Sequence, residues 1–273
     1  MSSTVNELLL LSGTRVLPIL AASNVGFYLI YKKSGMMTWV DVAWAFNHAL
    51  VGGYFFYINQ AYKSAEGIVY MTLLLSWSLR LGSHLIKRCF DTHSDPRYEM
   101  ILKKYKANKS VVSLFQFEFQ ALLVTLTSIP LFFVFRGLSP KLALDWRSVS
   151  GISMIILGIL GEWRADSELE AFKKNNSEKN ENEKEKPICN KGLWKYSRHP
   201  NLFFDLMTWG GFAVLGLRME DKITYLATLG PVFLYFIMDL LSTRVTEKYM
   251  SSSRPNWKEH VKNTNKYLPF LKI

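Results

Sequence analysis

The sequence predicts an all-α polytopic membrane protein of about seven transmembrane helices, and three observations support this fold class. Apolar residues come in runs close to the roughly 20 residues that a bilayer-spanning helix needs. The mean hydropathy of the 273-residue chain is only +0.06, because long charged connections separate these runs. Lysine and arginine are concentrated in alternate connections. We therefore expect one membrane-embedded domain over residues 1–273, with the N-terminus outside and the C-terminus in the cytosol.

Seven apolar runs are the expected spans. In chain order they cover residues 8–31, 38–58, 67–86, 114–135, 149–163, 202–217 and 223–241. The fifth and sixth runs are short for a span. No basic segment precedes the first run and no clear cleavage site follows it, so we expect a retained helix rather than a signal peptide.

The formal net charge of +11 is distributed unevenly along the chain. Of the 33 lysine and arginine residues, 25 fall in the connections 32–37, 87–113, 164–200 and 244–273. The alternate segments 1–7, 59–65, 136–147 and 217–222 hold six. The positive-inside rule places the basic set in the cytosol. Because membrane orientation accounts for this charge, it argues against nucleic-acid binding.

Two features of the expected cytosolic connections concern loops and thiols. Residues 173–186 alternate Asn, Glu and Lys, a composition typical of a solvated, mobile loop. Cys89 and Cys189 also fall in cytosolic connections, so both are expected to be unpaired in a reducing compartment. Neither cysteine has histidine or cysteine neighbours at a zinc-like spacing, and no metal site is expected.

Charged residues inside apolar runs are candidates for function, because burying them in a bilayer is costly. Asp41 lies near the start of the second run, where it is either a functional group or a helix cap and dipole partner. Arg80 lies deeper in the third run, where it would pair with a carboxylate, snorkel or face a cavity. Glu118 and Asp239 lie closer to helix ends and are weaker candidates.

Residues 192–201, Gly-Leu-Trp-Lys-Tyr-Ser-Arg-His-Pro-Asn, combine cationic residues with the start of an apolar helix. Pro200 suits the first helical turn, where a missing N–H costs nothing. The free N–H groups and positive dipole end of that helix would lie beside Arg198 and His199 at the membrane surface. This arrangement suits a phosphate or pyrophosphate. Alternatively, Arg198 and Lys195 only anchor the helix to lipid head groups.

Polar residues at helical spacing occur on the fifth and sixth helices. Asp166, Glu170 and Lys173 share a face where the fifth helix continues into the cytosol; such a pattern is also typical of a solvated, ion-paired helix end. On the sixth helix, Asn201 and Asp205 follow one another on one face. If buried, an amide and a carboxylate need partners, and a bound polar cofactor would provide them.

The chain resembles the steroid 5-alpha-reductase C-terminal superfamily in several motifs. These are residues 192–201, the helix with Glu162 and Ala165-Asp166, and the tail with Arg254-Pro255 and Thr264-Asn265-Lys266-Tyr267-Leu268-Pro269. The earlier motifs Asp41-Val42-Ala43-Trp44, Asp95-Pro96-Arg97-Tyr98 and Phe119-Gln120-Ala121-Leu122 narrow the resemblance to a widespread, mostly uncharacterised group of that superfamily. Together they cover nearly the whole chain.

This resemblance implies a seven-helix membrane reductase that holds NADPH among the cytosolic ends of its later helices. It assigns the substrate to helices in residues 1–145 and the cofactor to residues 146–273, with a cytosolic loop at 173–190. The implied cofactor-binding residues are Asp166, Lys173, Tyr196, Arg198, His199, Asn201, Asp205, Arg244 and Arg254. The chain departs from the family where Leu202-Phe203-Phe204-Asp205 replaces Tyr-Phe-Gly-Glu, and where Thr208 replaces a second acidic residue.

The expected activity is NADPH-dependent reduction of a conjugated C=C bond in a lipophilic, lipid or sterol-like enone that enters from the bilayer. Negative charge builds on the carbonyl oxygen, and a well-placed donor stabilises it by roughly 3–4 kcal/mol. The expected catalytic residues are Tyr98 or Arg80 as that donor and Asp41 as the group that orients it. In a eukaryote, the expected location is the endoplasmic reticulum.

Two other functions are compatible with parts of the sequence. Isoprenylcysteine carboxyl methyltransferases also open a membrane helix with Arg-His-Pro, where they bind S-adenosylmethionine. Their paired glutamates after the last helix are not matched, because only Glu247 stands there. A non-enzymatic lipid-binding or scaffolding protein would leave the polar helix faces without a role. The several cations near one membrane boundary favour the phosphorylated cofactor.

Overall fold

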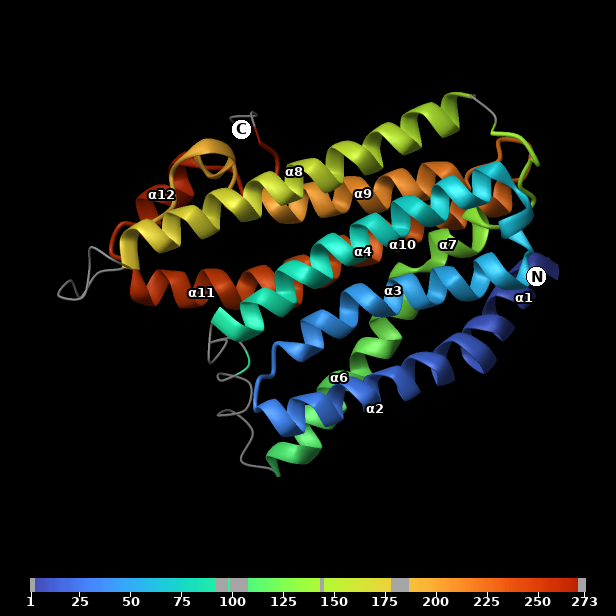
Figure 1. Cartoon of the computed structure of the whole chain (residues 1–273). Helices are drawn as coiled ribbons and strands as arrows, with labels where there is room; N and C mark the ends of the chain where they lie inside the picture. The colour runs from blue at the N-terminus through green and yellow to red at the C-terminus, as the bar shows by residue number, and fades with distance from the viewer. Residues whose placement is uncertain (1–2, 92–97, 99–107, 143–144, 178–186, 270–273) are drawn as a thin grey trace.

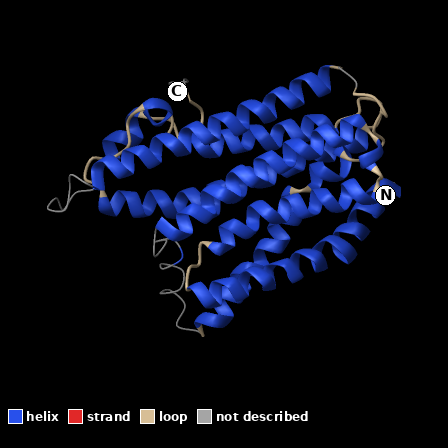
Figure 2. Ribbon diagram, viewed as in Figure 1, coloured by secondary structure: helices blue, strands red, loops and turns tan. Residues whose placement is uncertain are grey.

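The computed structural model describes residues 3–91, 98, 108–142, 145–177 and 187–269. The described residues form an all-helical bundle, and none of them belongs to a β-strand (Figure 2). Within this part of the chain, Ser197 and Asn265 form an isolated parallel β-bridge. The predicted all-α class is therefore confirmed.

The helices form seven consecutive stretches in the described part of the chain. They are α1 (Ser3–Leu11) with η1 (Ser12–Val16) and α2 (Leu17–Ser34); α3 (Trp39–Ile58); α4 (Ala65–Asp91); α6 (Lys109–Thr127) with α7 (Ile129–Val134); α8 (Trp146–Ser177); α9 (Pro200–Gly216); and η4 (Lys222–Thr228) with α10 (Leu229–Ile237), η5 (Met238–Thr243) and α11 (Arg244–Ser253). Three short elements complete the description: η2 (Ala61–Lys63), η3 (Gly192–Lys195) and α12 (Trp257–Asn263). Figure 1 shows α2, α4 and α8 running toward one end of the bundle and α3 and α9 running back.

Three stretches are long and apolar enough to cross a membrane, as judged by length and composition over the described residues. They are Ser3–Ser34, Lys109–Thr127 and Lys222–Ser253. Only 22%, 33% and 28% of their apolar windows are buried, so most of this apolar surface faces outward. Such surfaces are compatible with a lipid environment. The other four predicted spans are shorter or more polar, which leaves the number of seven a prediction.

Two predicted boundaries were wrong for identifiable reasons. The run 114–135 is divided into α6 and α7, because Pro130 lacks the N–H that would continue α6 and instead opens α7. The predicted loop at 173–186 starts too early, since α8 continues to Ser177. An apolar run shows where a helix can contact lipid. The helix itself ends where its backbone hydrogen-bond pattern ends. Residues 178–186 lie outside the described residues.

The interior of the bundle is partly polar. Asn47 Nδ2 donates to Asn24 Oδ1 at 2.7 Å, and Asn24 Nδ2 donates to the Phe117 carbonyl at 2.6 Å. His48 is fully buried, with Nδ1 2.8 Å from the Trp44 carbonyl and Nε2 2.8 Å from Thr127 Oγ1. These bonds tie α2, α3 and α6 together. A polar interior with apolar outer faces is the pattern expected when the surroundings are lipid.

Helices α8 and α9 approach one another closely because glycines line their contact. A Cβ on Gly211 would lie 2.7 Å from the Gly151 carbonyl oxygen, and a Cβ on Gly158 would overlap Thr208 and the Phe204 backbone. Glycine therefore lets these two backbones meet. This tight pairing fixes the position of α9 against α8 next to the site described below.

Candidate functional site

Arg80 connects α4 to α8 through two buried ion pairs. Its Nη1 lies 2.7 Å from Asp166 Oδ2, and its Nη2 pairs with Glu162 Oε2. Glu162 and Asp166 are four residues apart, so both carboxylates project from one face of α8. The exposed fractions of the three side chains are 13% for Arg80, 5% for Glu162 and 9% for Asp166. Buried charges of this kind persist only when they are paired.

Helix α9 contributes an amide and a further carboxylate to the same junction. Asn201 Nδ2 donates to Asp166 Oδ1 at 3.3 Å, and Trp77 Nε1 on α4 donates to Asp205 Oδ1 at 2.9 Å. Pro200 is the first residue of α9, as the sequence predicts, so Asn201 and Asp205 lie in its first two turns. The structure thus brings together four predicted site residues from three helices: Arg80, Asp166, Asn201 and Asp205.

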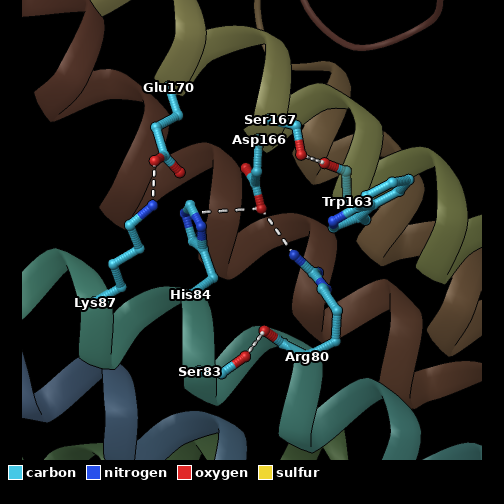
Figure 3. Close-up of a pocket in the computed structure, with 8 residues that line it drawn as sticks. All are labelled: Arg80, Ser83, His84, Lys87, Trp163, Asp166, Ser167 and Glu170. Carbon is cyan, nitrogen blue, oxygen red and sulfur yellow. Dashed lines mark hydrogen bonds and ion pairs between the residues drawn. The ribbon is translucent and has the colours of Figure 1, made fainter. Parts of the chain in front are cut away.

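A cleft of about 350 Å³ opens beside this junction between α4 and α8 (Figure 3). Its walls are four residues of α4, Arg80, Ser83, His84 and Lys87, and four of α8, Trp163, Asp166, Ser167 and Glu170. Lys87 pairs with Glu170 across the outer part of the cleft, and His84 Nε2 lies 3.8 Å from Asp166 Oδ2. The volume is at the small end of the range of about 300–1,000 Å³ for small-molecule pockets, which suits one end of a larger ligand.

Arg198 and His199 form a separate cluster at the start of α9. Arg198 Nε lies 2.9 Å and His199 Nε2 3.0 Å from the same oxygen of Glu247 on α11. Arg198 Nη1 also donates to the Thr264 carbonyl at 2.6 Å, and its side chain is only 9% exposed. In this arrangement Arg198 holds the C-terminal segment against α9. Its guanidinium is already engaged at the position where the sequence predicts a phosphate ligand.

The C-terminal segment is held by a second set of bonds. Ser197 Oγ donates to the Tyr267 carbonyl at 2.7 Å, and Tyr267 Oη donates to Asp239 Oδ1 at 3.1 Å. Burial raises the pKa of the Tyr267 phenol, which therefore stays protonated and remains a donor. Lys266 also pairs with Asp239, and Arg244 Nε lies 3.6 Å from its other oxygen. Arg244 therefore faces an acidic partner in this segment.

The remaining predicted cofactor residues lie around these clusters without joining one site. Arg254 follows α11, and its Nε donates to the Pro187 carbonyl at 3.2 Å. Tyr196 is exposed in the turn before Arg198, with Lys195 Nζ 5.8 Å from its ring centre. Lys173 is exposed near the end of α8, two turns beyond Asp166.

Two of the three predicted catalytic residues contact each other, and the third is elsewhere. Tyr98 Oη donates to Asp41 Oδ1 at 2.5 Å, so Asp41 can orient Tyr98 as expected. Arg80 pairs instead with Glu162 and Asp166 on α8. Arg80 is therefore associated with the predicted cofactor residues, and Asp41 and Tyr98 lie among the aromatic side chains at the start of α3.

Of the comparisons with known proteins, the one with protein-family models gives a match. A family model described as "Protein of unknown function (DUF1295)" matches residues 27–264. The chain belongs to this family. No curated protein and no solved structure matches it. The DUF1295 match includes the Arg80 junction, Asp41, Tyr98 and Glu247, and it ends before Lys266 and Tyr267.

Several residues at this candidate site were not among the predicted site residues. Four of them contact a predicted site residue: Glu162, Trp77, His84 and Glu247. The fifth, Lys87, pairs with Glu170 one turn beyond Asp166. Spacing could have indicated two of them, since His84 and Lys87 follow Arg80 by four and seven positions and share its helix face. Among the described residues, no group of three or more His, Cys, Asp or Glu side chains is arranged to hold a metal ion. Cys89 and Cys189 are free, as expected; both are buried, and Cys89 lies within α4 rather than in a connection.

Proposed function

We propose that this DUF1295 chain is an NADPH-dependent membrane oxidoreductase, similar to steroid 5-alpha-reductases, that reduces a conjugated C=C bond of a lipophilic substrate. The observation that carries the proposal is the junction in which Arg80 pairs with Asp166 while Asn201 donates to the same carboxylate. It places a buried cation next to two polar groups of the predicted cofactor region and beside a cleft. Strongly paired charges in a cleft are characteristic of functional sites.

The residues at this end of the bundle are chemically suited to a dinucleotide. The Asp166 carboxylate can accept hydrogen bonds from ribose hydroxyl groups, and the Asn201 amide can donate hydrogen bonds to them. Lys173 and Lys195 are exposed cations that would hold phosphate groups in place of Arg198, whose guanidinium is engaged by Glu247. Bound NADPH would supply a hydride to the β-carbon of the enone.

The chain's own residues would then control charge and water. Arg80 is a candidate donor to a developing carbonyl oxyanion, because Glu162 and Asp166 hold its Nη atoms while its buried Nε has no hydrogen-bond partner among the described residues. Tyr98, oriented by Asp41, is the second candidate donor. The buried aromatic rings of Trp77 and Trp209 keep the base of the junction dry.

Binding of nucleotides to the purified protein tests this proposal. We expect NADPH to raise the melting temperature, and NADH and S-adenosylmethionine to have little effect. Lys173→Gln should weaken NADPH binding by about 1.5–3 kcal/mol, the range for a hydrogen bond to a charged group. Lys222→Gln is the matched control, since Lys222 is exposed at the opposite end of the bundle. Stabilisation by S-adenosylmethionine alone would favour the methyltransferase and exclude the reductase.

Arg198 needs a separate variant, because its role in the fold differs from the role the family resemblance implies. Arg198→Ala should lower the melting temperature without nucleotide, since Glu247 and two carbonyl groups lose their donor. If Arg198 also binds phosphate, the variant should lose the stabilisation by NADPH in addition. An unchanged melting temperature without nucleotide would contradict the structural role.

We further propose seven spans with the N-terminus outside and the C-terminus in the cytosol, and in a eukaryote we propose the endoplasmic reticulum as the membrane. The uneven distribution of 25 and six basic residues supports this topology. The sequons at Asn108 and Asn175 then face the cytosol, and both should stay unmodified in a eukaryotic host. A glycosidase-sensitive mass shift that is lost in Asn108→Gln or Asn175→Gln would overturn this orientation.

A further inference from the structure

The two walls of the cleft continue as apolar stripes along α4 and α8. Positions three or four apart share a helix face. On α4 the stripe is Leu75, Leu79, Ser83 and Lys87; on α8 it is Ile156, Leu160, Trp163, Ser167 and Glu170. Leu79 and Leu160 are 58% and 54% exposed, so the apolar parts face outward. Each wall is therefore apolar toward the middle of the bundle and polar at the cleft.

Two exposed tryptophans on α8 indicate where the cleft lies relative to a bilayer. Trp146 and Trp163 are 53% and 57% exposed. Their separation along the helix is about 25 Å at 1.5 Å per residue, comparable to a hydrocarbon core of about 30 Å. Tryptophan favours the two membrane interfaces. With Trp163 at one interface, Asp166 and Glu170 lie one to two turns beyond it, at the level of the lipid head groups.

The two walls carry opposite charge. Arg80 and Lys87 lie on the α4 wall, and Asp166 and Glu170 lie on the α8 wall (Figure 3). In the outer part of the cleft the charges of Lys87 and Glu170 cancel, so this part suits a neutral but dipolar ligand. Trp163 stands on the acidic wall, where an indole ring can attract a quaternary ammonium group. A phosphate toward α4 and an ammonium toward α8 would match this polarity.

One ion pair across the cleft can exchange with such a ligand. Lys87 and Glu170 have side-chain exposures of 55% and 48%, and pairs this exposed contribute little to stability. The inner pair of Arg80 and Asp166 is buried and would remain closed. The outer part of the cleft is therefore the part that can admit a head group.

We propose that the α4/α8 cleft binds the zwitterionic head group of a bilayer phospholipid, phosphocholine above all, while its acyl chains lie along the apolar stripes of both helices. The phosphate would contact Lys87 and His84 on α4, and the ammonium would contact Glu170 and Trp163 on α8. This inference rests on the proposed topology, in which α4 and α8 cross the bilayer, and it goes beyond the proposed reduction, because it does not depend on NADPH.

Native mass spectrometry of the full chain in mild detergent tests the inference, with added phosphatidylcholine or phosphatidylglycerol. We expect phosphatidylcholine adducts to dominate. Trp163→Leu should reduce them by about two- to five-fold, the effect of losing one exposed cation–π contact. Trp146→Leu removes the other exposed interface tryptophan of α8 and should leave them unchanged. Equal losses in both variants, or equal binding of the two lipids, would overturn the proposal.

A charge exchange provides a second test that preserves the ion pair. Lys87→Glu combined with Glu170→Lys keeps the net charge and reverses the polarity of the outer part of the cleft. We expect a lower ratio of phosphatidylcholine to phosphatidylglycerol adducts at an unchanged melting temperature. An unchanged ratio would contradict the assigned orientation. Soluble glycerophosphocholine should bind far more weakly than the lipid, and equal binding would show that the apolar stripes contribute nothing.

Discussion

Helix α8 packs against its two neighbours in different ways. Toward α9 it presents glycines at Gly151 and Gly158, and the two backbones meet without intervening side chains. Toward α4 it presents Glu162, Asp166 and Glu170, and long charged side chains bridge the gap. The first contact leaves no room for a ligand, and the second leaves a cleft. Helix α8 therefore packs tightly against α9 in its first half and borders the cleft with α4 in its second half.

The largest expected effect comes from removing the cation of the α4/α8 contact. Arg80→Met leaves Glu162 and Asp166 buried without their partner, which typically costs about 3–5 kcal/mol. Arg164→Met is the matched control, because Arg164 forms an exposed pair with Glu168 on the same helix. Thermal unfolding in detergent should show a large fall for Arg80→Met and almost none for Arg164→Met. Equal melting temperatures for the two variants would show that the ion pairs do not hold α4 and α8 together.

The second effect tests the glycine contact of α8 with α9. Gly158→Ala adds a Cβ that overlaps Thr208 and the Phe204 backbone, and overpacking of this kind costs roughly 1–3 kcal/mol. Gly26→Ala on α2 adds the same group in open space and should be neutral or slightly stabilising. The measurement is again thermal unfolding. A Gly158→Ala variant as stable as Gly26→Ala would mean that the two backbones can move apart at little cost.

The smallest effect concerns the outer part of the cleft. Lys87→Gln should change the free energy of unfolding by no more than about 1 kcal/mol, because both members of its pair with Glu170 are about half exposed. A salt titration sharpens the comparison, since ions screen exposed pairs more strongly than buried ones. High salt should therefore remove the difference between Lys87→Gln and wild type, and should leave the larger Arg80→Met difference in place. If the stability difference between Lys87→Gln and wild type persists in high salt, this pair is shielded from solvent in the same way as the buried pairs of Arg80.

The sequence was sufficient for the features that depend on near neighbours. Apolar periodicity predicted the helical class, and the fixed backbone angle of proline predicted that Pro200 opens α9. Helical spacing also predicted that Asn201 and Asp205 share a face and need polar partners if buried. We expected a bound cofactor to supply them, whereas Asp166 bonds to the first and Trp77 to the second.

The pairings between distant residues could not be predicted in the same way. Arg80 and Asp166 are 86 positions apart, and Arg198 and Glu247 are 49 positions apart. The sequence pattern of an arginine at a helix start is the same whether the side chain binds a phosphate or a glutamate from a later helix. Only the packing of α11 and the C-terminal segment against α9 decides that Arg198 is engaged.

The bridge between Ser197 and Asn265 has a consequence for the biogenesis of the protein. A ribosome synthesises the chain from the N-terminus, so the partners of Arg198 on α11 and at Thr264 emerge long after α9 has been made. Residues 197–199, which precede α9, therefore lack these partners until the residues around Asn265 have been synthesised. A nascent chain halted before Asn265 should remain open to protease at the start of α9.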